Sequence, residues 1–216
     1  VGESHDELIL QSLLNYRDLP LAKAMQSMTR LISSMHEDAL NALRNRDLEL
    51  AEDIIQRDDE VDRFYLLIVR QLKAAIEDPG LSEKIGITHP RECLGYRLIS
   101  KSMERIGDHA EKIARNIIEL DSGVESIDRI CEMGAMAHDV FMRGIASLSK
   151  ENTKDANSVI TDAAEVVAMG IAIDKDIRKE CNVTEVSFIL ESLRRIAEYG
   201  ADIAEISINL NTEELR

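Results

Sequence analysis

Hydrophobic residues recur at gaps of three and four along most of this chain, the spacing that lines up one face of an α-helix. The first such stretch predicts a helix from about residue 21 to residue 44. Its apolar seam consists of Met25, Met28, Ile32, Met35 and Ala39. Residues 21–78 contain neither Gly nor Pro, and residues 91–216 contain no Pro, so long uninterrupted helices are expected.

The same periodicity predicts five more helices. We expect them at about 47–77, at 91–120, from 127 to a turn at 152–153, from that turn to about 181, and at 184–210. Asp47 is a candidate N-cap, and residues 79–90 form the longest connection. Strict alternation of apolar and polar residues is missing, so no strand is predicted and the fold class is all-α.

The order of these helices repeats itself. A shift of 105 positions places the apolar residues of the first two helices on those of the fourth and fifth, and a shift of 90 relates the third helix to the sixth. The coinciding pairs include Met28 with Met133, Met35 with Val140, Ile54 with Val159, Val61 with Val166, Ile99 with Ile189 and Ile113 with Ile203. The alternative is that unrelated amphipathic helices align by chance, but one offset serves two consecutive helices. A duplicated three-helix unit is therefore predicted.

The repeat divides the chain into three parts. Residues 1–19 are a lead segment, either a linker or a short helix built on Leu8, Ile9, Leu13 and Leu14. Residues 20–121 form the first repeat and residues 122–216 the second. The chain begins with Val1 rather than Met, which suggests a trimmed chain or a piece of a longer protein.

Composition narrows the function classes. The 216 residues are 44% hydrophobic and 31% charged, which argues against a disordered chain, and no apolar stretch is long enough for a membrane span. The net charge of −15 argues against direct nucleic-acid binding and favours metal cations or a basic protein surface as partners. Cys93, Cys131 and Cys181 lack the spacing of a zinc site or a disulfide framework, which indicates a reducing cytoplasm.

Two pairs of carboxylates have the spacing of neighbours on a helix face. Asp58 and Asp62 lie in the second predicted helix, and Glu104 and Asp108 lie in the third, each pair at i and i+4. Four hard oxygen ligands from two helices suit Mg²⁺, Ca²⁺, Mn²⁺ or iron. On a helical wheel Asp58 and Asp62 fall in the apolar arc, whereas Glu104 and Asp108 lie opposite the seam. The spacing alone leaves a solvated acidic surface as the open alternative.

Two segments resemble the signature of the PhoU family of phosphate-transport regulators. They are residues 47–62 and 103–115, the second reading Met-Glu-Arg-Ile-Gly-Asp-His-Ala-Glu-Lys-Ile-Ala-Arg. The resemblance covers about residues 20–210 and implies an elongated, six-helix PhoU-like bundle made of two tandem three-helix bundles. It also implies a surface metal cluster, with Asp58, Asp62, Glu104 and Asp108 as ligands. Iron is the expected metal, with manganese, magnesium, calcium, nickel or zinc as alternatives.

The second repeat departs from the family pattern. The positions equivalent to the four acids are Ala163, Val167, Arg194 and Glu198. We therefore expect a single cluster, in the first repeat, and a helix ion pair between Arg194 and Glu198. His109, which follows Asp108, is interpreted as a surface residue rather than a ligand. The Met-rich seam is interpreted as core packing, with a partner groove as the alternative.

The resemblance implies a regulatory adaptor rather than an enzyme. Such a protein would be a negative regulator of phosphate uptake that contacts the ATPase of a phosphate ABC transporter, a sensor kinase, or both. It would be cytoplasmic, peripheral to the membrane through its partners, free of direct nucleic-acid contact, and a homodimer or other homo-oligomer. The alternatives are a regulatory module for potassium or sodium-phosphate transport, and an enzyme with a carboxylate-bridged di-metal centre.

Overall fold

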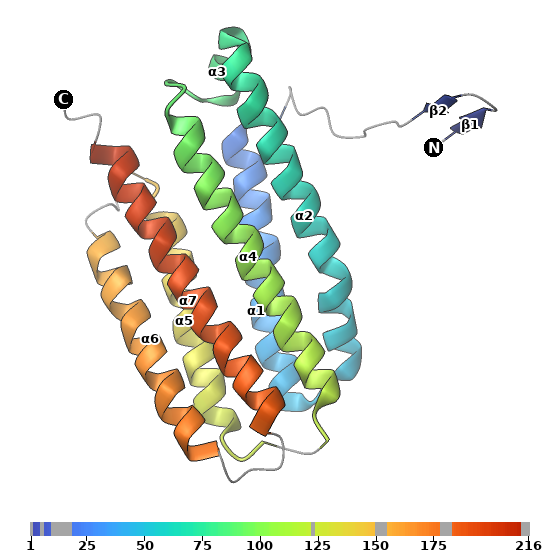
Figure 1. Ribbon diagram of the computed structural model, residues 1–216, viewed down its shortest axis with the longest axis vertical. Coiled ribbons are helices and arrows are strands. Elements are labelled where there is room, and N and C mark those ends of the chain that lie inside the picture. Colours follow the sequence, from blue (N-terminus) through green and yellow to red (C-terminus); the bar gives the residue numbers. More distant parts are fainter. Residues whose placement is uncertain are drawn as a thin grey trace.

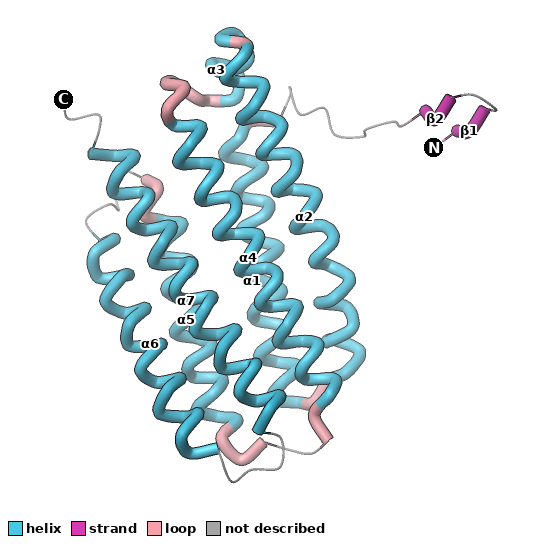
Figure 2. Tube along the Cα trace, viewed as in Figure 1, coloured by secondary structure: helices cyan, strands magenta, loops and turns pink. Residues whose placement is uncertain are grey.

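The computed structural model describes residues 2–4, 7–9, 19–121, 124–149, 155–177 and 183–212. Within these residues the chain forms seven helices packed lengthwise into an elongated bundle, with a small strand pair at the N-terminus (Figure 1). The elements are β1 (Gly2–Ser4), β2 (Glu7–Ile9), α1 (Leu21–Asn45), α2 (Leu48–Glu77), α3 (Pro79–Ile85), α4 (Glu92–Glu119), α5 (Ile127–Ala146), α6 (Ala156–Asp176) and α7 (Val183–Thr212). The loops that the structure describes lie at the two ends of the bundle (Figure 2).

Helices α1, α2, α4 and α7 begin and end within two residues of the predicted bounds, whereas α5 ends at Ala146 and α6 spans only Ala156–Asp176, several residues inside the predicted limits. Asp47 is the N-cap of α2, because its side chain accepts a hydrogen bond from the backbone N–H of Leu50 (3.0 Å). The expectation that residues 79–90 form only a connection is wrong, since Asp78 caps a further short helix, α3, that ends at Gly86. A seven-residue helix is too short for apolar periodicity to reveal it.

The N-terminal segment also differs from expectation. Gly2–Ser4 pairs antiparallel with Glu7–Ile9, so a strand pair exists where none was predicted. Leu8 and Ile9 lie in β2 rather than in a short helix, whereas Leu13 and Leu14 lie outside the described residues. Strands of three residues give too short an alternation to be recognised in a sequence. The boundary predicted between residues 121 and 122 stays a prediction, because residues 122–123 are not described.

Equivalent positions of the two repeats touch each other in the bundle. The repeats meet where α4 packs on α7 and where α1 packs on α5. The hydroxyl of Ser33 lies 2.8 Å from Nε2 of His138, its counterpart 105 positions later. The His109 ring lies 5.9 Å from the ring of Tyr199, its counterpart 90 positions later. Such contacts are typical of a two-fold arrangement, in which the same surface of each half meets itself.

One continuous core runs through both repeats. Met25, Met28, Met35 and Met133 are buried in it, which confirms the interpretation of the Met-rich seam as core packing.

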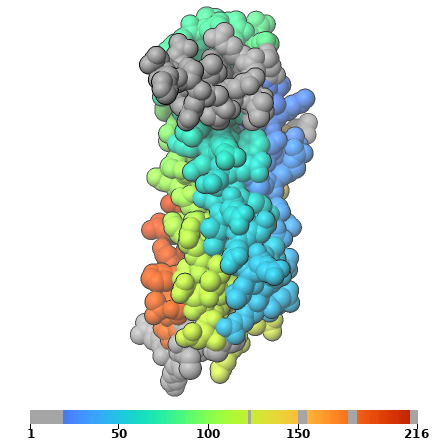
Figure 3. Space-filling view, turned by 90° about the vertical axis from the view of Figure 1, so that its right-hand side faces the viewer, coloured from blue at the N-terminus to red at the C-terminus, as the bar shows by residue number. Residues whose placement is uncertain are grey.

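Helix α2 covers one side of the bundle between α1 and α4 (Figure 3). Among the described helices, α6 is long and apolar enough by length and composition to cross a membrane, although no membrane span was predicted. In the structure α6 packs against α5 and α7.

Two glycines bring α5 and α7 into backbone contact. A Cβ atom added to Gly144 would lie 2.5 Å from the carbonyl oxygen of Gly200. The equivalent positions in the first repeat are Ala39 in α1 and Ala110 in α4, both fully buried. The second repeat therefore has a glycine pair where the first repeat has an alanine pair.

An ion pair between helices is kept in both repeats with its charges exchanged. In the first repeat Arg57 of α2 binds Asp38 of α1 (Nη2–Oδ2 2.7 Å). At the equivalent positions of the second repeat, Asp162 of α6 binds Arg143 of α5 (Oδ2–Nη1 2.5 Å). The acid and the base have changed helices, but the link between the helices remains.

This exchange leads to a testable prediction about stability. Asp38→Arg places two guanidinium groups side by side, and we expect it to lower the free energy of unfolding by about 1–2 kcal/mol, because both positions are only partly exposed. The double variant Asp38→Arg/Arg57→Asp copies the second repeat and should recover most of that loss. Urea denaturation of the double variant and of both single variants, Asp38→Arg and Arg57→Asp, measures this. A double variant as unstable as the sum of its single changes would contradict the prediction.

Candidate metal centre

The four predicted ligands lie on two helices that pack against each other. Asp58 and Asp62 belong to α2, and Glu104 and Asp108 belong to α4. The helices approach closely at Gly107, where an added Cβ atom would lie 3.0 Å from Cγ1 of Val61 and 3.5 Å from Oδ1 of Asp58. Gly107 therefore allows the Asp58 carboxylate to lie directly against α4, one residue from Asp108.

The carboxylates on these two helices act on one another electrostatically. The pKa of Asp58 is raised from 3.8 to about 7, first by burial and then by the negative charges of Asp108, Glu111, Asp62 and Glu104, in that order. Burial also raises the pKa of Asp108, and Glu104 adds to this, while Lys112 and Lys101 oppose it. We call Asp58, Asp62, Glu104, Asp108 and Glu111 the acidic cluster.

The side chains of the acidic cluster are not exposed in the way that the helical wheel predicted. Asp58 and Asp108 are half-buried and Asp62 is exposed, although Asp58 and Asp62 were expected in the apolar arc together. Glu104, expected on a solvated face, is only 8% exposed. The wheel placed Glu104 opposite the seam of α4 but could not show that this flank packs beside α2.

Two members of the acidic cluster already bind cationic side chains. Lys101 binds both carboxylate oxygens of Glu104 and also lies 5.1 Å from the centre of the Tyr65 ring. Arg115 binds Glu111, four positions before it on the same helix, through Nη2 (2.5 Å). In the part of the chain that the structure describes, no salt bridge holds Asp58, Asp62 or Asp108.

The donor set of the acidic cluster fits a hard cation. All five groups are carboxylates, and the pKa of Asp58 is raised by burial first and by repulsion from its neighbours second, both of which a bound cation would offset. As the side chains stand, no three His, Cys, Asp or Glu residues of the described chain lie close enough together to hold one ion. Coordination would therefore require rotation of these side chains, and Glu104 would have to leave Lys101.

The second repeat carries a reversed pair where the first has Lys101 and Glu104. Glu191 and Arg194 occupy the equivalent positions and bind each other. The expected pair of Arg194 with Glu198 is wrong, because Glu198 binds Arg195 instead (3.0 Å). On a helix both i+3 and i+4 partners lie within reach, so the sequence could not decide which of two adjacent arginines Glu198 selects.

His109 does not lie on the open surface as expected. It is half-buried between α4 and α7, beside Tyr199, whose ring also receives the guanidinium of Arg105 at 5.4 Å. The pKa of His109 is lowered from 6.5 to about 4, first by burial and then by the positive charges of Lys112 and Arg195. The neutral imidazole therefore belongs to the contact between the repeats.

Sequence reasoning missed the part that Lys101 and Glu111 play at this site. Lys101 precedes Glu104 by three positions, and Glu111 follows Asp108 by three, so each spacing was a signal for a neighbour on the same helix face. Spacing alone leaves both residues on an ordinary solvated face of the third predicted helix. Only the packing of α2 against α4 shows that this face borders Asp58.

Known proteins match this chain over both repeats. The family model described as the PhoU domain matches residues 25–117 and 130–207. A phosphate-specific transport system accessory protein PhoU homolog of Streptococcus pneumoniae is 26% identical over 93% of this chain and 97% of its own length. A homolog of the same description from Borreliella burgdorferi is 24% identical over 83% of this chain and 86% of its own length.

Solved structures match the fold as well. The crystal structure of the phosphate transport system regulatory protein PhoU from Streptococcus pneumoniae gives a TM-score of 0.79 at 22% identity, covering 91% of this chain and 95% of that one. PhoU from Pseudomonas aeruginosa gives 0.76 at 19% identity, covering 89% and 96%. The expected all-α, elongated bundle is thereby confirmed. The matched proteins are regulatory accessory proteins, not enzymes.

Proposed function

Because this chain belongs to the PhoU family, we propose that it is a negative regulator of phosphate uptake. The observation that carries this proposal is the match of both repeats to the family, together with accessory proteins of phosphate-specific transport systems that align over nearly their whole length. The protein would act as an adaptor that contacts the ATPase of a phosphate ABC transporter or a sensor kinase. It would work in the cytoplasm, reach the membrane through these partners, and form a homodimer.

We further propose that the acidic cluster binds metal cations, with iron first and manganese, magnesium, calcium, nickel or zinc as alternatives. The mutual repulsion of the carboxylates and the close approach of α2 and α4 at Gly107 support this. A bound metal would supply positive charge that links the two helices. Asp58, Asp62 and Asp108 are the residues best placed to bind it, and Glu104 would join them once released by Lys101.

Phosphate uptake by living cells tests the regulatory proposal. The chain is expressed in a bacterium whose own PhoU homolog has been deleted, and uptake of labelled phosphate is measured in phosphate-rich medium. Wild-type protein should lower uptake towards that of the parent strain, and immobilised protein should retain the transporter ATPase or the sensor kinase from purified components. Unchanged uptake together with no retention of either partner would contradict the proposal.

Metal binding is tested separately from regulation. Adding Mn²⁺ or anaerobic Fe²⁺ to chelator-treated protein should raise its melting temperature by several degrees, because a cation that bridges α2 and α4 stabilises only the folded state. The variant Asp62→Asn/Asp108→Asn should lose this shift. Asp59→Asn, which removes a charge from an exposed neighbour on α2, should keep it. A shift that is equal in all three proteins would place the metal elsewhere.

Lys101 is expected to compete with the metal for Glu104. Lys101→Met removes this competitor and one positive charge, so we expect it to tighten Mn²⁺ binding about tenfold, equivalent to roughly 1.4 kcal/mol. Isothermal titration calorimetry measures the change. Lys112→Met is the matched control, since Lys112 acts on Asp108 through space but is not the residue that binds Glu104. Equal effects of the two variants would show that only overall charge matters.

A further inference from the structure

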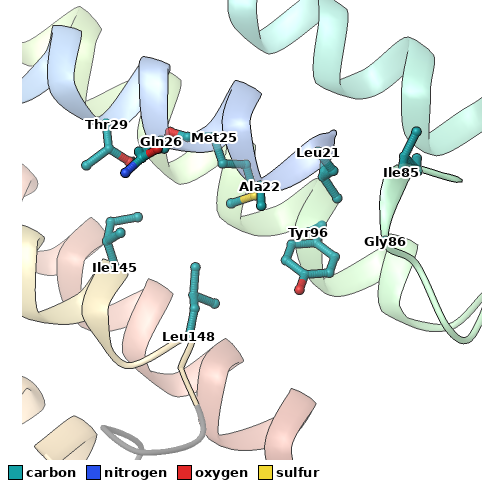
Figure 4. Close-up of a pocket in the computed structure, with 10 residues that line it drawn as sticks. All are labelled: Leu21, Ala22, Met25, Gln26, Thr29, Ile85, Gly86, Tyr96, Ile145 and Leu148. Carbon is teal, nitrogen blue, oxygen red and sulfur yellow. Dashed lines mark hydrogen bonds between the residues drawn. The ribbon is translucent and has the colours of Figure 1, made fainter. Parts of the chain in front are cut away.

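We propose that a pocket between the two repeats binds an uncharged, mainly apolar small molecule. The pocket has a volume of about 290 Å³. It lies where the first turns of α1, the C-terminal end of α3, the N-terminal half of α4 and the end of α5 come together (Figure 4). The residues that line it are Leu21, Ala22, Met25, Gln26, Thr29, Ile85, Gly86, Tyr96, Ile145 and Leu148.

The lining indicates the charge of the ligand. None of these ten residues is charged, although 31% of the chain is. The polar side chains are those of Gln26, Thr29 and Tyr96, and the Thr29 hydroxyl already donates to the carbonyl of Met25 (2.9 Å). A charged ligand would lose its hydration here without gaining an opposite charge, whereas an uncharged one could use the few polar groups for orientation.

The internal repeat shows that the pocket is a built feature of one end of the bundle. The positions equivalent to Ile145 and Thr29 are Leu40 and Gly134, which lie at the other end of the contact between α1 and α5. There the Leu40 side chain occupies the space beside Gly134, so closely that a Cβ atom on Gly134 would overlap it. At the pocket end the corresponding space stays open between Ile145 and Thr29, which Figure 4 shows facing each other.

One wall of the pocket comes from a segment that the second repeat lacks. Ile85 and Gly86 belong to the connection that accounts for the difference between the two repeat offsets. Gly86 has φ +89°, a left-handed conformation that ends α3 and turns the chain towards α4. The insertion therefore encloses a space that the rest of the duplicated fold would leave open.

The volume limits the size of the ligand. At about 30 Å³ for each water-sized group, 290 Å³ holds roughly ten non-hydrogen atoms, near the lower end of known ligand pockets. A compound of this size would contact α1 and α4 of the first repeat and α5 of the second at once. Its binding would hold the two repeats in the arrangement described here.

Binding of 1-naphthol, a neutral probe of suitable size, tests the proposal on the full chain. We expect saturable binding with one site per chain and at least tenfold weaker binding of the carboxylate analogue 1-naphthoate. Thr29→Leu, which fills the pocket, and Ala22→Phe, at its exposed edge, should each weaken 1-naphthol binding at least tenfold. Thr161→Leu, the same substitution as the first on an exposed face of α6, should leave binding unchanged.

Each contrary result has a defined meaning. Equal affinity for the two probes would overturn the assignment of an uncharged ligand. Unchanged binding by folded Ala22→Phe would move the site elsewhere and overturn the proposal, even if Thr29→Leu failed to fold. Tighter 1-naphthol binding by Leu13→Ser/Leu14→Ser would show that the chain's own N-terminal segment occupies the pocket, which would also overturn it. None of these outcomes depends on phosphate regulation or metal binding.

Discussion

Gly144→Ala is expected to lower the free energy of unfolding by about 2–4 kcal/mol. The added methyl group would lie 2.5 Å from the carbonyl oxygen and 3.3 Å from the carbonyl carbon of Gly200. These are backbone atoms of α7, so the contact can be relieved only by moving a whole helix. The higher helix propensity of alanine returns about 1 kcal/mol at most, which is less than the expected steric cost.

The first repeat supplies the control for this experiment. Ala110→Gly, at the position equivalent to Gly200, creates a small space in the same kind of helix contact and should cost only about 1 kcal/mol in propensity and lost packing. Urea denaturation with circular dichroism measures both variants. Gly144→Ala within 0.5 kcal/mol of wild type, roughly the limit for neutral substitutions, would show that α5 and α7 separate easily.

Asp58→Asn is expected to stabilise the metal-free protein while abolishing its stabilisation by metal. The pKa of Asp58 rises from 3.8 to about 7 on folding, which at full strength corresponds to about 4 kcal/mol of unfavourable free energy at high pH. The side chain is half-exposed, so screening reduces the expected gain to about 1–2 kcal/mol at pH 8. Asp59→Asn, with the same loss of charge, should show no comparable gain.

The stability gained by Asp58→Asn is expected to increase with pH. A raised carboxylate pKa contributes stability that is present below pH 3.8 and is lost as the pH rises through 7, so the advantage of Asp58→Asn should grow between these values. His36 acts in the opposite direction, since burial lowers its pKa from 6.5 to about 4 and stability therefore rises over that window. Urea denaturation of the wild type and Asp58→Asn, with chelator at pH 5 and pH 8, separates the effect of Asp58 from that of His36, which both proteins share. An equal gain at both pH values would contradict the prediction.

The sequence predicted the long helices and the duplication because both depend on apolar periodicity, which burial preserves. It failed where an element is too short to show a period, as in α3 and the strand pair Gly2–Ser4 with Glu7–Ile9. It also could not show that α4 packs on α7. The contact of His109 with Tyr199 follows from that packing, and a helix pattern says which face is buried but not what covers it.

The sequence likewise identified the carboxylates of the candidate site but not the side chains that compete for them. Spacing alone placed Asp58 with Asp62 and Glu104 with Asp108, and the packing of α2 on α4 brings the pairs together. What spacing could not supply was the local competition for each carboxylate. Lys101 binds Glu104, and this pairing depends on which side chains lie side by side once the helices have packed.

The exchanged charges of the Asp38–Arg57 and Arg143–Asp162 pairs bear on how a doubled chain avoids pairing the wrong helices. Helices with matching apolar seams could in principle trade places, α2 packing on α5 and α6 on α1. Such a swap would set Arg57 against Arg143 and Asp38 against Asp162, two like-charged encounters in place of two attractive ones. Because the acid and the base sit on opposite helices in the two repeats, each helix pair favours its own partner during assembly. Two identical copies of the repeat would lack this discrimination.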